Sequence, residues 1–182
     1  MKILSVDVQK MLAAALFGLV ASAGAGAAQE ATLTDSSTDW AIYVVENPKE
    51  CFIVSAPTTW RAERGGQAVD VRRDDIRFYV SVIPSENVTN EPSFKAGYPL
   101  RNDGTVEMRI GSDSFTLFPN PDINPEYAWS KPEDDSGLIA AMRGGAEALV
   151  TGVSQRGTTT FDTFSLIGFT AAIERAQELC AS

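Results

Sequence analysis

The chain has 182 residues and a net charge of −9, with 24 Asp plus Glu against 15 Lys plus Arg. Such an acidic balance repels phosphate backbones and argues against nucleic-acid binding. The chain also has no histidine, so it lacks the usual general base of a nucleophilic serine and the commonest ligand of zinc and iron sites.

The N-terminal segment is organised like a secretory signal peptide. Lys2 and Lys10 come first, an apolar run follows over residues 11–20, and residues 21–28 are small. The run is only about ten residues long, whereas a membrane-spanning helix needs roughly 20. We therefore predict that residues 1–28 are a signal peptide.

The remaining chain, residues 29–182, has a length typical of one domain. We expect a single β-rich domain that starts near Gln29 and has no stable membrane span once the signal is removed. The predicted location is periplasmic or secreted.

Alternation of apolar and polar residues predicts most of the strands. We expect strands at Trp40–Val45, Cys51–Ser55, Ile76–Val82, Val106–Ile110, Ala148–Ser154 and Thr158–Leu166. Val69 and Val71 are expected to form a hairpin with the third of these. The fourth is expected to turn at Gly111 and pair with a strand containing Phe115 and Leu117.

Two helices are predicted. Pro132 is suited to a first helical turn, and Gly144 with Gly145 is suited to the end of that helix. The second helix begins at Phe169, after Gly168, and carries an apolar face to which Cys180 belongs. The predicted fold is mainly β, an antiparallel β-sandwich or barrel with a C-terminal helix packed on the sheet and one additional short helix.

The chain has two cysteines, Cys51 and Cys180. In an oxidising compartment they can form one disulfide, which would stabilise the fold by up to about 4–5 kcal/mol by closing a long loop. A reactive cysteine is the alternative, but the chain offers neither a histidine base nor a Cys-x-x-Cys motif. We predict a structural disulfide that fastens the terminal helix to the sheet.

The proline-rich stretch 118–129 is predicted to be an irregular loop, because prolines prevent ladder pairing. It holds Tyr127 and Trp129. Turned inward, which we favour, the two rings would plug one end of the sheet; exposed, they would form a partner surface.

The charged residues are given structural roles. The group Glu133, Asp134 and Asp135 could bind calcium or act as an acid and base pair, but acidic residues are also favoured at a helix start. Arg72, Arg73 and Arg77 are predicted to be solvated surface. A turn or a bulge in the predicted strand explains the presence of Asp162 there as well as a functional site would. We expect no catalytic residues, no cofactor and no metal.

Four segments resemble the invasion-associated locus B family of exported alphaproteobacterial proteins: "NPKECFIVSAP", "VRRDDIRFYVSVIP", "FKAGYPL" and "GTTTFDTFSLIGFTAA". The resemblance runs from about Trp40 to Cys180 and is most specific over Thr163–Ala172. It implies a compact, exported, β-rich domain, and the family name is linked to host-cell invasion and virulence. It supplies no catalytic residues.

Together these observations predict an exported, non-enzymatic envelope protein that binds an unknown envelope or host protein through its surface loops. A carboxylate-based hydrolase of the periplasm, which would use Asp134, Asp135 or Asp162, is one alternative. A carrier of a small ligand is the other.

Overall fold

The computed structural model describes residues 30–181, so the predicted signal peptide lies outside the described residues. In chain order the elements are β1 Thr32–Ser37, β2 Trp40–Val45, β3 Glu50–Ser55, β4 Thr59–Arg64, β5 Gln67–Ala68, β6 Arg77–Ile83, η1 Pro84–Glu86, β7 Val88–Lys95, β8 Val106–Ile110, β9 Asp113–Asn120, β10 Asn124–Trp129, α1 Pro132–Gly144, β11 Glu147–Val153, β12 Thr159–Ser165 and α2 Phe169–Ala181.

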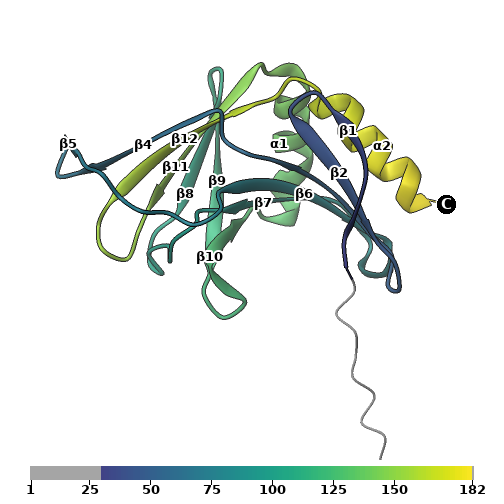
Figure 1. Ribbon diagram of the computed structural model, residues 1–182, viewed down its shortest axis with the longest axis horizontal. Helices are drawn as coiled ribbons and strands as arrows, with labels where there is room; N and C mark the ends of the chain where they lie inside the picture. Colours follow the sequence, from purple (N-terminus) through teal and green to yellow (C-terminus); the bar gives the residue numbers. More distant parts are fainter. Residues whose placement is uncertain (1–29, 182) are drawn as a thin grey trace, which may run out of the picture.

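The strands form one antiparallel sheet. Its order is β1-β2-β3-β6-β7-β10-β9-β8-β11-β12-β4-β5, and the sheet is not closed. It bends until its two halves face each other, because the Phe164 ring of β12 lies 5.8 Å from Phe78 of β6 and 6.2 Å from Phe94 of β7. Figure 1 shows this bend, with both helices along the same side of the sheet. The predicted fold class is confirmed, and the core lies inside the bend.

The C-terminal helix docks as its apolar spacing predicts. Phe169, Ala172, Ile173, Ala176 and Cys180 are its buried residues, and the Phe169 ring meets Trp40 of β2 edge to face at 5.2 Å. The turn before α2 requires glycine, because Gly168 has a φ of +90° and an added Cβ would lie 2.2 Å from the Ser37 carbonyl oxygen. Within residues 30–181 no helix is long and apolar enough to cross a membrane.

One predicted hairpin is wrong. The Val69 and Val71 segment forms no strand with Ile76–Val82; instead β6 pairs with β3 and β7. Residues 69–76 are a long connection, and Asp74 N donates to the Gly97 carbonyl. The Arg73 side chain holds this connection against the far half of the sheet, as described below. The other predicted hairpin, β8 with β9, is confirmed.

The irregular loop predicted over residues 118–129 is also wrong. The stretch is a hairpin in which β9 pairs with β10, and β10 pairs with β7. Pro125 lies in the part of β10 where the register with β9 shifts, between Asn124 and Ala128. A ladder N–H is not needed at that irregularity, so proline is tolerated there.

Candidate functional site

The disulfide predicted between Cys51 and Cys180 is present. The Cα atoms are 5.9 Å apart, and the bond joins β3 to the last turn of α2. Both cysteines are buried, so neither is exposed as a nucleophile. The disulfide is a fastener at one end of the sheet, where α2 covers β2 and β3.

A row of aromatic side chains crosses the outer face of the sheet. Successive ring centroids are 5.2 Å apart from Tyr43 to Phe52, 6.0 Å from Phe52 to Tyr79, 6.1 Å from Tyr79 to Tyr127 and 5.6 Å from Tyr127 to Trp129. We call these five residues the aromatic row. All five are half-buried, which leaves part of each ring in contact with solvent.

The aromatic row faces away from the core. Side chains alternate between the two faces of a strand, and Ala128, between Tyr127 and Trp129, is fully buried. The two predicted site residues therefore neither plug one end of the sheet nor stand in a loop. Burial and the neighbouring Tyr127 raise the pKa of Tyr79, as expected for rings packed closely side by side.

Two exposed apolar residues lie on segments connected to the aromatic row. Leu33 of β1 pairs with Tyr43 and is 57% exposed. Ile123, in the turn between β9 and β10, is 71% exposed. Leu33 thus extends the apolar surface next to Tyr43, and Ile123 is exposed immediately before β10, the strand that carries Tyr127 and Trp129.

A buried ion pair joins the two halves of the sheet. Arg73 donates to both carboxylate oxygens of Asp162, at 2.5 and 2.9 Å, and to the Ala96 carbonyl at 2.7 and 3.0 Å. The side chains of Arg73 and Asp162 are only 2% and 0% exposed. The prediction that Arg73 is solvated surface is wrong, because its guanidinium bridges residues 69–76 to the middle of β12.

Two rings enclose the same guanidinium. The centroids of Tyr98 and Trp60 lie 5.0 and 5.3 Å from the Arg73 guanidinium carbon. Burial raises the pKa of Asp162, while the bonds from Arg73 act in the opposite direction. Asp162 thus needs Arg73 to remain ionised, and neither a turn nor a bulge explains it.

A cleft of about 600 Å³ opens beside this ion pair. Its lining comes from five segments of the chain: Arg64, Asp70, Val71, Arg72, Arg73, Asp74, Gly97, Tyr98, Pro99, Glu126, Ser154, Gln155, Arg156, Thr158 and Thr160. At its base the Tyr98 hydroxyl is 2.7 Å from Thr160 Oγ1, and Arg64 donates to Thr158 Oγ1 at 2.7 Å. Burial raises the pKa of Tyr98 to about 12.

The acidic residues Glu133, Asp134 and Asp135 lie in the first turn of α1. Asp135 accepts a 2.5 Å hydrogen bond from Ser130. A second cleft of about 600 Å³ lies beside it and includes Glu91 and Arg143. Burial, and then the charge of Asp135, raise the pKa of Glu91.

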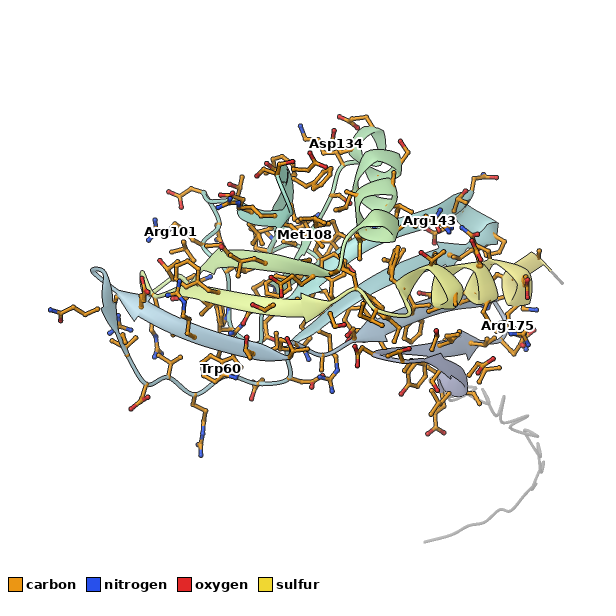
Figure 2. All side chains as sticks on the ribbon, turned by 90° about the horizontal axis from the view of Figure 1, so that it is seen from above. Trp60, Arg101, Met108, Asp134, Arg143 and Arg175 are labelled. Atoms are coloured by element: carbon orange, nitrogen blue, oxygen red, sulfur yellow. A yellow bond between two sulfur atoms is a disulfide. The ribbon has the colours of Figure 1, made fainter. Side chains whose placement is uncertain are left out.

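The structure does not bring the predicted carboxylates into one site. Asp162 lies on β12 opposite Trp60, whereas Asp134 is at the tip of α1, on the other side of the molecule in Figure 2. Within residues 30–181 no group of three or more Asp, Glu or Cys side chains could hold a metal ion.

No family model and no curated protein sequence matches the chain. Its fold is similar to that of invasion associated protein B from Bartonella henselae, with a TM-score of 0.52. The match covers 83% of this chain and 100% of the other at 16% identity. A likeness at that identity concerns the fold alone, so function must be argued from the surfaces described above.

Proposed function

We propose that the protein is an exported, non-enzymatic interaction protein that binds another envelope or host protein. The aromatic row is the observation that carries this proposal. Tyr and Trp side chains offer large, rigid contact area and are enriched where proteins bind each other. Contact is made by the face of the sheet around Tyr127 and Trp129 and by the turn that holds Ile123, where the sequence had suggested loops alone.

Three further features support this role. The net charge of −9 disfavours nucleic acid as the partner, and a structural disulfide is typical of proteins outside the cytoplasm. The similar fold of an invasion associated protein is consistent with a related role. A hydrolase is disfavoured, because Asp162 is fully buried and occupied by Arg73.

Site-specific photocrosslinking in the producing cells tests the proposal. Photoreactive residues placed at Leu33, which pairs with Tyr43, and at Ile123, in the turn before β10, should each give an adduct with the same protein. The same residue placed at Trp60, which is 45% exposed and lies on β4, is the matched control and should not give that adduct.

Substitution within the aromatic row provides the second part of the test. Tyr127→Thr combined with Trp129→Thr keeps residues that suit a strand but removes both rings, so the adduct from position 123 should be lost. The proposal that this face binds the partner would be refuted if the adduct from position 123 persisted in this variant. It would also be refuted if position 60 gave the same adduct.

A further inference from the structure

The arginines of the chain divide into two groups. Each arginine of the first group forms an ion pair with a carboxylate: Arg61, Arg73, Arg77, Arg109, Arg143 and Arg175. Among residues 30–181, the other group, Arg64, Arg72, Arg101 and Arg156, forms no ion pair. We call these four the unpaired arginines.

The unpaired arginines gather around one cleft. Arg64, Arg72 and Arg156 line the cleft beside the buried ion pair. Arg101 reaches the same loop, since its Nη2 atom would lie 3.7 Å from a Cβ added at Gly157. Figure 2 places Arg101 at the end of the molecule away from Arg175 of α2. The unpaired arginines are thus concentrated at one place on the molecule.

The cleft is built on a fixed base. Arg73 and Asp162 neutralise each other there and are held by several hydrogen bonds. Arg64 is oriented by its bond to Thr158. The carboxylate of Asp162 is already paired with Arg73. No ion pair joins the unpaired arginines of the lining to its carboxylates, so these arginines remain free to bind an anion that enters the cleft.

From this arrangement we infer that the cleft binds a small hydroxylated molecule that carries an oxyanion, such as a sugar acid or sugar phosphate. Guanidinium groups bind carboxylate and phosphate oxygens through paired N–H donors. Asp70, Asp74 and Glu126 also line the cleft; they accept hydrogen bonds from hydroxyl groups and repel a ligand that is anionic throughout. The volume of about 600 Å³ is in the range of small-molecule sites.

Isothermal titration calorimetry at low ionic strength tests this inference with three probes: glucuronate, glucose 6-phosphate and glucose. At least one of the two charged sugars should bind with a Kd of about 1 mM or tighter. Glucose, which has the hydroxyls but no oxyanion, should bind at least about tenfold more weakly, since a charge-assisted hydrogen bond is the stronger kind. The charged sugar that binds identifies the oxyanion as carboxylate or phosphate.

Two arginine variants test whether the charged sugar binds in the cleft. Arg156→Gln should raise the Kd of the charged sugar by about tenfold or more. The control, Arg109→Gln, removes the same charge from β8, outside the cleft lining, and should leave the Kd unchanged. The inference is overturned if neither charged sugar binds the native protein, if glucose binds as tightly, or if both variants weaken binding equally. The crosslinked partner at the aromatic row is a separate readout, so failure here leaves the proposed function standing.

Discussion

The substitution Asp162→Asn is expected to destabilise the protein strongly. It leaves the Arg73 guanidinium charged, 2% exposed and bonded only to the Ala96 carbonyl and an amide oxygen. An arginine cannot lose its proton inside a protein, so the buried charge persists. Removing one partner of a buried ion pair costs about 3–5 kcal/mol.

This loss should be easy to measure. A domain is stable by only about 5–15 kcal/mol, and in a domain of this size each kcal/mol lowers Tm by about 2–4 °C. We therefore expect Asp162→Asn to lower Tm by on the order of 10 °C, together with a lower urea midpoint. Asp75→Asn is the matched control, because the ion pair of Asp75 with Arg77 is 49% and 35% exposed and contributes under about 1 kcal/mol.

Substitution of the other partner, Arg73→Met, should lower the free energy of unfolding by an amount that depends on pH. Burial already raises the pKa of Asp162 and Arg73 opposes that rise, so the variant should raise this pKa further. A folded-state pKa above the unfolded value makes the folded state lose stability as pH rises through it. The deficit of Arg73→Met should thus be smallest at acidic pH, below the ordinary pKa of an aspartate, and grow as pH rises, while that of Asp162→Asn should not depend on pH in this way.

Urea unfolding at several pH values measures both effects. The double variant Arg73→Met with Asp162→Asn removes both charges and should lose less than the sum of the single losses. If Asp162→Asn were no worse than Asp75→Asn, or if the two single losses simply added, the claim that this ion pair holds residues 69–76 to the sheet would be refuted.

Two further predictions concern other parts of the fold. Replacing Cys51 and Cys180 by alanine should lower the free energy of unfolding by up to about 5 kcal/mol, because the disulfide closes a loop of 129 positions; a reductant that leaves the urea midpoint of the native protein unchanged would contradict this. Glu91→Gln should stabilise the protein at pH 7. Burial, and then Asp135 and Glu86, raise the pKa of Glu91, so the folded protein loses stability as pH rises and Glu91 ionises. That gain should disappear near pH 4.5, and a gain equal at both pH values would refute it.

The strands that alternate strictly could be predicted from the sequence, and several others could not. In β2 and β12, buried residues recur at every second position, which is the signal that predicts a strand. In β1 all but the last residue are exposed, so no apolar alternation marks it. Pro125 made β10 unpredictable, because proline normally argues against a strand but is tolerated where the register shifts.

The candidate sites, too, could be predicted from the sequence only in part. The partner of Asp162 could not be predicted, because Arg73 lies far away in the chain and no spacing links the two. A local signal was present, however: Asp162 occupies the inward phase between Thr160 and Phe164, and a charged residue there needs a buried partner. The aromatic row had a comparable signal, since Tyr43 and Tyr79 each lie on the outward phase of their strands.

The two ends of the molecule are held in different ways, and this difference bears on function. Near β3 and α2 the sheet is fastened covalently by the disulfide. At the cleft, residues 69–76 add no strand to the sheet, and Arg73 is the side chain that ties them to β12. The wall that carries Arg72 is thus held by this buried ion pair and by the hydrogen bond from Asp74 N to the Gly97 carbonyl. A ligand bound by Arg72 would add a further contact to that wall, so binding at the cleft and the stability of the Arg73–Asp162 pair should rise and fall together.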